Sequence, residues 1–307
     1  FFFKQKTAYE IPKRDWSSDV CSSDLCLLVA SCASGSATST TLGEATTTIT
    51  VASATTTLAS TTTTLAPTTT TIPPTEEIIS LGKSVEGRDI TVIHRLDVPG
   101  AALRDEDPNR FTVLVIGVIH GNEDAGLEIV DELRRKAADD FAADPNLARL
   151  DLWLLPAMNP DGVAADRRTN ANLVDLNRNF PYEWGPIAEP GNWQYAGSGP
   201  ASEPETQILM SFVEELRPDL TVWYHQDAYC IAPSNGPDGP ARAEYARLTG
   251  LPLKSVTGGK YTGVAATWQR KTYVDDTAFI VELGASLAPG EATMHAEAIL
   301  AITALVP

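Results

Sequence analysis

Cysteine, histidine and positive charge are all scarce in this sequence of 307 residues. Of its four cysteines only Cys230 lies beyond residue 32, which excludes a framework of disulfides as the basis of the fold. Lysine and arginine total 23 against 40 acidic residues, and nearly all of the net charge of −17 falls on residues 76–307. So acidic a domain argues against nucleic acid and against direct adhesion to anionic lipid. Long apolar runs are also absent there, and no stretch suits a membrane span.

The first 25 residues differ in character from the rest. Two blocks, Lys4–Ile11 (KQKTAYEI) and Asp15–Leu25 (DWSSDVCSSDL), resemble in order the translation of a sequencing-library adapter. The alternative is a genuine polar tail. We expect residues 1–25 to be foreign to the natural chain and leave them out of the fold.

Residues 26–32 resemble the end of a bacterial lipoprotein signal. A short apolar run, Leu27–Ala30, closes on Ser31 and Cys32, and Cys32 would become the lipidated first residue. The alternative is an ordinary secretory signal cut near residues 33–36. Both predict a protein outside the cytoplasm, either as a cell-surface lipoprotein or secreted.

Residues 33–75 consist largely of Thr, Ser and Ala, with a single charged residue, Glu44, and no aromatic residue. Such a composition cannot bury enough apolar surface to offset its chain entropy, so we predict a disordered tether. As a flexible coil it would average about 35 to 40 Å from end to end. The only membrane contact that we expect is the lipid on Cys32.

Residues 76–307 alternate strand and helix patterns. Ser202 in N-cap position and the early Pro204 mark the start of one of the helices. Alternation of this kind predicts a single α/β domain with a mixed, mostly parallel central sheet flanked by helices, whose ligands gather at strand C-terminal ends. The expected strands are 89–94, 111–119, 150–155, 219–224 and 277–283, and the expected helices 123–136, 203–216 and 289–305.

The stretch Val113–Gly126 (VLVIGVIHGNEDAG) joins a buried strand to a helix. His120 and Glu123 lie at the corner between them. Three residues apart in such a turn, an imidazole and a carboxylate can converge on one metal ion, and both are ligands of catalytic zinc. The same pair is also compatible with a helix cap at His120 and a carboxylate favoured by the helix dipole at Glu123.

Two later segments end at the same edge of the predicted sheet. His225 closes the strand LTVWYH, and two near ligands with one remote ligand leave a fourth position for water, as in catalytic zinc sites. Glu282 lies within the apolar strand FIVELG. An unpaired buried carboxylate costs several kcal/mol, so Glu282 needs a partner or a chemical task.

Seven motifs occur in order, and together they resemble zinc metallocarboxypeptidases of the carboxypeptidase A-like kind, most closely the short bacterial murein-peptide amidase branch. The resemblance spans residues 80–304 and implies the zinc carboxypeptidase fold for residues 76–307. The motifs are GKSVEGRDI at 82–90, HGNE at 120–123, NPDG at 159–162, RTNANLVDLNRNFP at 168–181, SEPET at 202–206, WYHQDAYC at 223–230 and VEL at 281–283.

The resemblance implies one Zn²⁺ per chain, bound by His120, Glu123 and His225. It implies that Glu282 is the general base and acid and that Arg168 stabilises the oxyanion. It also implies that Asn177 and Arg178 hold the terminal carboxylate of the substrate. These roles agree with the chemistry, since a planar guanidinium suits bidentate binding of a carboxylate better than an ammonium does.

Three positions depart from the family pattern. The tyrosine that closes over substrate has no secure counterpart; Tyr261 lies in the right region, but its spacing to Trp268 is shifted. Arg167 could compete with Arg168, although Arg168 alone fits the R-x-N-A pattern. The side-chain pocket, expected between Tyr261 and Val274, matches no recognised type, so the substrate's last residue stays open.

The resemblance predicts a zinc metallocarboxypeptidase, a hydrolase acting next to a free C-terminal carboxylate, with a peptide or muropeptide from the cell wall as substrate. Two alternatives remain, an N-acyl-amino-acid deacylase of the aspartoacylase type and a non-catalytic binding lipoprotein. The motifs NPDG, DLNRNFP and SEPET speak against the first, and an intact Glu282 speaks against the second. We expect a monomer that binds no nucleic acid.

Overall fold

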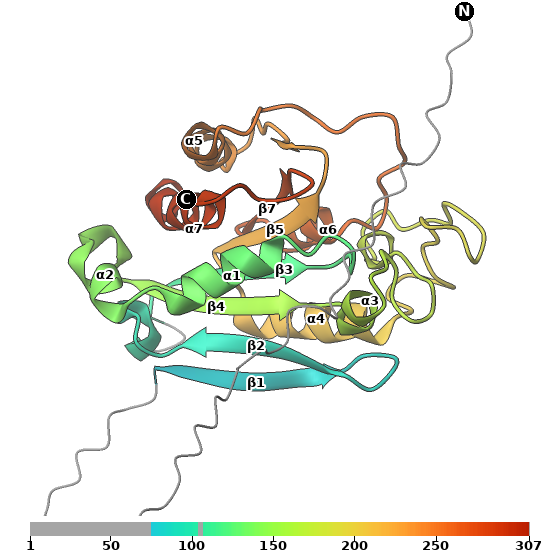
Figure 1. The fold of residues 1–307 in the computed structure, drawn as a ribbon, viewed down its shortest axis with the longest axis horizontal. Coiled ribbons are helices and arrows are strands. Elements are labelled where there is room, and N and C mark those ends of the chain that lie inside the picture. The colour runs from blue at the N-terminus through green and yellow to red at the C-terminus, as the bar shows by residue number, and fades with distance from the viewer. Residues whose placement is uncertain (1–74, 104–106, 307) are drawn as a thin grey trace, which may run out of the picture. The chain divides into compact units, whose positions relative to one another are not determined.

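A sheet of seven strands forms the centre of the computed structural model, which describes residues 75–103 and 107–306 (Figure 1). The described residues all belong to one compact unit, Thr68–Pro307. The predicted adapter remnant, the signal segment with Cys32 and nearly all of the tether lie outside the described residues. The strands are β1 (Glu76–Lys83), β2 (Asp89–Arg95), β3 (Phe111–Val118), β4 (Leu150–Ala157), β5 (Leu220–Gln226), β6 (Cys230–Ile231) and β7 (Thr277–Leu283).

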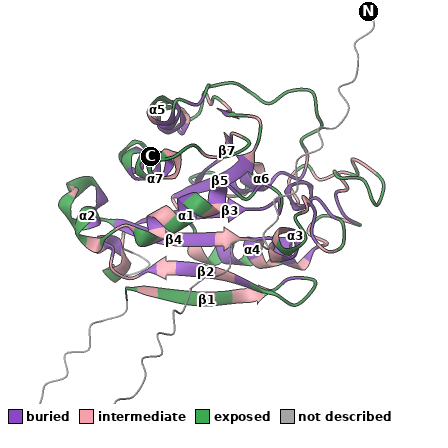
Figure 2. Ribbon diagram, in the orientation of Figure 1, coloured by how far each residue is buried: buried purple, intermediate pink, exposed green. Residues whose placement is uncertain are grey.

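The sheet has the order β1-β2-β4-β3-β5-β7-β6, with parallel pairing among the four central strands. The remaining strands pair antiparallel: β1 with β2, β2 with β4, and β6 with β7. The prediction of an α/β domain with a mixed sheet is confirmed, and its parallel part is the centre. All eight residues of β3 are buried, as the unbroken apolar run requires, whereas β1 is an edge strand with exposed residues on it (Figure 2).

Helices cover both faces of the sheet. One core joins the sheet to α1, α5 and α7 through side chains such as Val115, Leu133 and Ile299. A second core joins the other face to α4 and α6 through Ile116, Phe212 and Trp268. The helices are α1 (Gly126–Arg135), α2 (Ala138–Ala143), α3 (Pro160–Ala164), α4 (Pro204–Leu216), α5 (Gly239–Thr249), α6 (Ala265–Thr272) and α7 (Glu291–Ile302), with short 3₁₀ turns η1 (Pro99–Ala102), η2 (Pro145–Leu147), η3 (Leu176–Arg178) and η4 (Thr303–Leu305).

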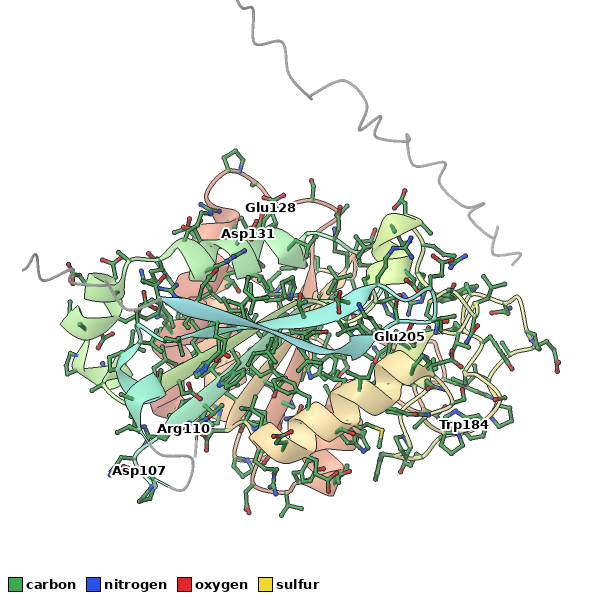
Figure 3. The ribbon with its side chains drawn as sticks, turned by 90° about the horizontal axis from the view of Figure 1, so that it is seen from below. Asp107, Arg110, Glu128, Asp131, Trp184 and Glu205 are labelled. Atoms are coloured by element: carbon green, nitrogen blue, oxygen red, sulfur yellow. The ribbon has the colours of Figure 1, made fainter. Side chains whose placement is uncertain are left out.

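Helix α1 shows the expected amphipathic pattern. Ile129, Val130 and Leu133 are buried, whereas Glu128 and Asp131 point away from the sheet (Figure 3). The helix begins at Gly126 and not at Glu123 as predicted, because residues 121–125 form turns that direct the side chain of Glu123 towards His120 and His225.

Helix α4 begins at Pro204, as the proline predicts, but its N-cap is Glu203 and not Ser202. The hydroxyl of Ser202 instead donates to Glu203 Oε1 at 2.8 Å and accepts from Asn179 Nδ2 at 3.0 Å. Figure 3 shows Glu205 at the start of the helix, where its Oε1 accepts from the Val85 N–H at 3.1 Å. Among residues 75–103 and 107–306, no helix combines the length and apolar character needed to cross a membrane.

Candidate active site

The corner after β3 is held by close backbone contact with α3. A Cβ atom on Gly121 would lie 1.8 Å from the carbonyl carbon of Gly162, so only glycine fits. The side chain of Asn159 fixes the same contact, since its Nδ2 donates to the Ile119 carbonyl at 3.1 Å and its Oδ1 accepts from the Gly162 N–H at 2.9 Å. The motifs HGNE and NPDG therefore form one structural unit that positions His120.

Three donor atoms converge at this corner. Nδ1 of His120 lies 2.8 Å from Oε2 of Glu123, and Nδ1 of His225, at the end of β5, lies 2.9 Å from the same oxygen. The two imidazole nitrogens are 3.1 Å apart. All three side chains are buried, and together they could hold a metal ion. His120, Glu123 and His225 are called the metal group from here on.

This donor set fits zinc. Two nitrogens and a carboxylate oxygen with bonds of about 2.0 to 2.1 Å in a tetrahedron would lie about 3.4 Å apart, close to the separations found here. Buried imidazoles and a buried carboxylate that meet without an apolar neighbour between them are the expected surroundings of a cation. The other two histidines in the described part of the chain do not belong to this group. His94 pairs with Asp151 at 2.7 Å, and His295 lies in the core.

Asp175 supports the donor set from behind. Its Oδ1 lies 3.0 Å from Nε2 of His120, which leaves Nδ1 of that ring to face the site. Asp175 is fully buried, and although burial raises the pKa of a carboxyl, the imidazole of His120 and the guanidinium of Arg168 hold the pKa of Asp175 well below its usual range. The nearby imidazoles likewise lower the pKa of Glu123 against the opposing effect of burial.

Arg168 contacts both carboxylates of this network. Its Nη1 donates to Glu123 Oε1 at 2.6 Å, and its Nε donates to Asp175 Oδ2 at 3.1 Å. Arg168 lines the cavity, whereas Arg167 binds backbone carbonyls of its own loop, those of Thr169 and Asn170. Arg168 is thus the arginine of this pair that the structure brings to the metal group.

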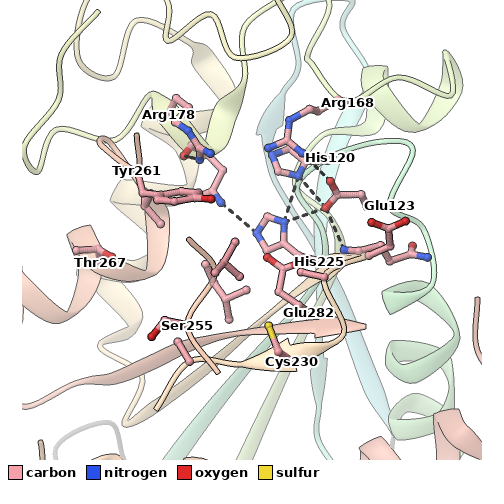
Figure 4. Close-up of a pocket in the computed structure, with 18 of the residues that line it drawn as sticks. His120, Glu123, Arg168, Arg178, His225, Cys230, Ser255, Tyr261, Thr267 and Glu282 are labelled. Carbon is pink, nitrogen blue, oxygen red and sulfur yellow. Dashed lines mark hydrogen bonds and ion pairs between the residues drawn. The ribbon is translucent and has the colours of Figure 1, made fainter. Parts of the chain in front are cut away.

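Glu282 faces the same cavity from β7. It is the register partner of His225 on the neighbouring strand, so the two side chains lie on one face of the sheet at the same height. Figure 4 shows Glu282 directly below His225, with Cys230 beside it. Burial raises the pKa of Glu282, which the imidazole of His225 partly offsets. A carboxylate with a raised pKa beside a metal group is suited to proton transfer.

Arg178 and Tyr261 form the opposite wall of the cavity. The guanidinium of Arg178 lies 5.3 Å from the centroid of the Tyr261 ring (Figure 4). Arg178 is 4% exposed, its Nε has no hydrogen-bond partner, and burial lowers its pKa. Among the described residues no carboxylate lies within ion-pair distance of it. A buried guanidinium of this kind offers donors to an incoming anion.

Asn177 makes its contacts within the protein. Its Oδ1 accepts from the Ala265 N–H at the start of α6 at 3.0 Å, and its Nδ2 lies 3.2 Å from Nε2 of His225. The structure therefore places Asn177 at the cavity as a link between α6 and His225, and its predicted contact with substrate stays a prediction.

Sequence reasoning missed the role of Asp175 and the far wall of the cavity. Asp175 is not among the site residues predicted above, yet it bonds His120 and Arg168; its place two residues before Asn177 in DLNRNF is the sequence signal for it. The cavity of about 440 Å³ extends past Thr267 to Arg270 of α6 and to Arg242 of α5. No motif marked either arginine.

The profile of the zinc carboxypeptidase family matches residues 62–257 of this chain, which include the three metal-group residues but not Glu282. Mouse carboxypeptidase D is 35% identical over 150 residues, which are 45% of this chain and 10% of that protein. Murein peptide amidase A of Escherichia coli K12 is 30% identical over 175 residues, 52% of this chain and 66% of that protein. This chain thus spans only about a tenth of the carboxypeptidase D proteins that it matches.

Solved structures share the fold. Carboxypeptidase A from Helicoverpa armigera superposes with a TM-score of 0.62 at 20% identity, over 76% of this chain and 69% of that one. The murein-tripeptide amidase from Escherichia coli O157 superposes with a TM-score of 0.54 at 24% identity, over 76% of this chain and 92% of that one. The family profile covers more than half of the sequence and includes all three residues of the metal group. The chain therefore belongs to the zinc carboxypeptidase family.

Proposed function

We propose that this chain is a zinc-dependent carboxypeptidase, which hydrolyses the peptide bond next to a free C-terminal carboxylate. One observation carries the proposal: a metal group, a carboxylate with a raised pKa and a buried guanidinium without a carboxylate partner line a single cavity. The metal group supports hydrolysis, Glu282 supports proton transfer, and Arg178 supports recognition of an anionic chain end.

The residues divide the reaction among them. His120, Glu123 and His225 would hold the zinc ion, which would supply polarisation of the scissile carbonyl and a lower pKa for water. Glu282 accepts a proton from the attacking water as the new C–O bond forms, and it delivers that proton to the nitrogen as the C–N bond breaks. The products are a shortened peptide and a free amino acid.

Two arginines complete the mechanism. Arg178 binds the terminal carboxylate through parallel N–H donors, which fixes the last peptide bond over the metal group. A guanidinium has five N–H groups, and the contacts of Arg168 with Glu123 and Asp175 leave donors for the negative charge that develops on the carbonyl oxygen.

The substrate that we propose is a cell-wall peptide. Its support is the 30% identity to murein peptide amidase A over half of this chain, together with the lipoprotein-like segment that ends at Cys32. A lipid-anchored enzyme on a tether would act outside the cytoplasm, where such peptides are exposed.

Amidation of the substrate tests the proposal. Replacing the free C-terminal carboxylate by an amide leaves the Arg178 guanidinium without its partner and should cost about 2 to 5 kcal/mol of transition-state stabilisation. The measurement compares kcat/KM for peptides and muropeptides with free and amidated ends, with and without a chelator.

The other outcomes identify the alternatives. Equal, chelator-sensitive rates on free and amidated peptides would indicate an endopeptidase. Cleavage of N-acyl amino acids but not of longer peptides would indicate a deacylase. Tight binding of peptides without hydrolysis by the zinc-loaded protein would indicate a binding lipoprotein.

A further inference from the structure

The cavity continues beyond the catalytic groups along helix α6. This helix begins next to Asn177, and Arg270 lies five residues after Ala265, about 7.5 Å further along the axis. Thr267, one turn earlier on the same face, has a short side chain and lines the cavity as well. Apolar residues such as Ile280, Val256 and Ala232 line the sides. The shape suits a side chain with a methylene stem and a polar end.

Two arginines at this end differ in how their charges are balanced. Arg242 of α5 is buried, and its Nε donates to Asp238 Oδ2 at 2.6 Å, so its charge is neutralised by that carboxylate. Asp238 also accepts from the Ser234 hydroxyl at 2.5 Å, and its pKa lies below the usual range because these two donors and the nearby charge of Arg270 outweigh the effect of burial. Both oxygens of Asp238 are therefore already hydrogen-bonded, one to Ser234 and the other to Arg242.

Arg270 has no such partner. Its guanidinium donates to the Ala278 carbonyl and, at 3.3 Å, to the Thr267 hydroxyl, which are both neutral groups. Among the described residues no carboxylate lies within ion-pair distance of it. Burial and the neighbouring Arg242 lower the pKa of Arg270 to about 10, although the Asp238 carboxylate opposes them, and Arg270 stays charged at neutral pH. Arg242 and Arg270 thus share the charge of one nearby carboxylate, that of Asp238, so this end of the cavity carries a net positive charge in an otherwise acidic domain.

A largely buried guanidinium with no carboxylate within ion-pair distance favours an anionic ligand, because the ligand replaces the interactions that the guanidinium has lost with water. The cavity has two such groups: Arg178 near the metal group and Arg270 further along α6. A residue with one carboxylate at its Cα and another at the end of its side chain would engage both.

Resting on the proposed carboxypeptidase function, we propose that Arg270 makes the enzyme selective for a C-terminal residue with a carboxylate at the end of its side chain. Two sources share this chemistry. One is a peptide that ends in glutamate, and the other is a cell-wall peptide that ends in meso-diaminopimelate. Each has a matched partner without the distal carboxylate, namely glutamine and lysine.

The experiment measures kcat/KM of the full-length, zinc-loaded protein for four peptides that differ only in this last residue. We expect glutamate over glutamine and diaminopimelate over lysine by about 10- to 100-fold, the usual worth of a charge-assisted hydrogen bond. The pair with the larger ratio of kcat/KM values shows whether the preferred substrate ends in glutamate or in diaminopimelate. Equal rates within both pairs would overturn the inference.

Variants assign the selectivity to one side chain. Arg270→Met, which keeps the length but removes the charge, should bring both ratios close to one. Arg270→Glu should reverse the second pair, so that lysine is preferred over diaminopimelate. Arg247→Met is the matched control, because Arg247 is an exposed residue of α5 paired with Glu244, and it should keep the wild-type ratios. Unchanged ratios in Arg270→Met would contradict the assignment.

A binding measurement separates this inference from the proposed function. Calorimetry with N-acetylglutamate and N-acetylglutamine should show the same preference for the acid, whether or not the protein hydrolyses peptides. Chelator-sensitive cleavage without any preference would refute the selectivity alone. A preference in binding without hydrolysis would refute the proposed function alone. If Arg270→Met does not fold, Arg270→Lys and the wild-type ratios still decide the question.

Discussion

At the scale of single residues, Glu282 is the position at which catalysis and metal binding can be separated. Its neighbours His225 and Cys230 on the adjacent strands hold it at the cavity, and the three metal-group residues do not depend on it for a donor atom. We predict that Glu282→Gln lowers kcat by about 10²- to 10⁴-fold, because the amide cannot accept a proton. Zinc content, measured by atomic absorption, should stay near one per chain.

The comparison variant is His120→Ala, which should lose both zinc and activity, because a donor atom disappears. Full hydrolysis by Glu282→Gln would refute the proposed role of Glu282. Loss of zinc from Glu282→Gln would instead show that this carboxylate belongs to the metal's own ligands.

The candidate site divides into residues that the sequence could predict and residues that it could not. His120 and Glu123 share one turn, so their spacing alone suggested a metal pair, and His225 and Glu282 ended apolar strands at the same edge of the sheet. Arg270 gave no such signal. Whether a guanidinium has a carboxylate within ion-pair distance depends on which side chains of α5, α6 and β7 meet in space. The spacing of residues along the chain does not predict this.

At the scale of elements, a buried hydrogen-bond chain connects β5, α5 and α7. The Tyr224 and Tyr245 hydroxyls lie 2.7 Å apart, and the Tyr245 hydroxyl lies 2.7 Å from Nδ1 of His295. If Tyr245 donates to the imidazole, Tyr224 donates to Tyr245, so each hydroxyl has one acceptor. Burial lowers the pKa of His295 to about 4 against the opposing effect of the Glu291 carboxylate, 3.7 Å from its Nε2, so at neutral pH the ring is neutral and able to accept.

From the hydrogen bonds that link Tyr224, Tyr245 and His295 we predict a loss of stability in mild acid. The folded pKa of His295 lies below its ordinary value of 6.5, so between pH 6.5 and about 4 the unfolded chain binds a proton that the folded protein does not. The free energy of unfolding should therefore fall with decreasing pH over this window, by an amount on the order of 3 kcal/mol. Urea titrations at pH 7.5 and 5 should show a smaller fall for His295→Gln than for wild type; equal falls would refute the role of His295.

Elements with strong patterns were predicted well. The structure has β7 over Thr277–Leu283, as predicted, and β3 ends within one residue of the prediction. Helix α5 was missed because its buried residues include Arg242, Tyr245 and Thr249, which give no apolar stripe. Strand β1 was missed because an exposed edge strand shows little alternation, and it is stabilised by pairing with β2.

At the scale of the whole molecule, our prediction of a lipid anchor makes the location of the acidic domain depend on a single cysteine, Cys32. We predict that the native protein partitions into detergent on phase separation and that Cys32→Ser moves it to the aqueous phase, since the lipid is the only expected membrane contact. Cys26→Ser is the matched control and should still partition into detergent. Aqueous partitioning of the wild type, or no change in Cys32→Ser, would rule out the lipid anchor.

The spacing of the metal ligands has a consequence for folding. His120 and Glu123 follow β3, whereas His225 closes β5, the neighbouring strand, about a hundred residues later in the sequence. One ion bound to all three would tie together two strands that the chain joins only through that long segment, and the unfolded chain could hold it only weakly. Bound zinc should then act as a removable cross-link, and the melting temperature should rise with the concentration of free zinc. A shortage of zinc would then shorten the lifetime of the folded chain as well as remove activity.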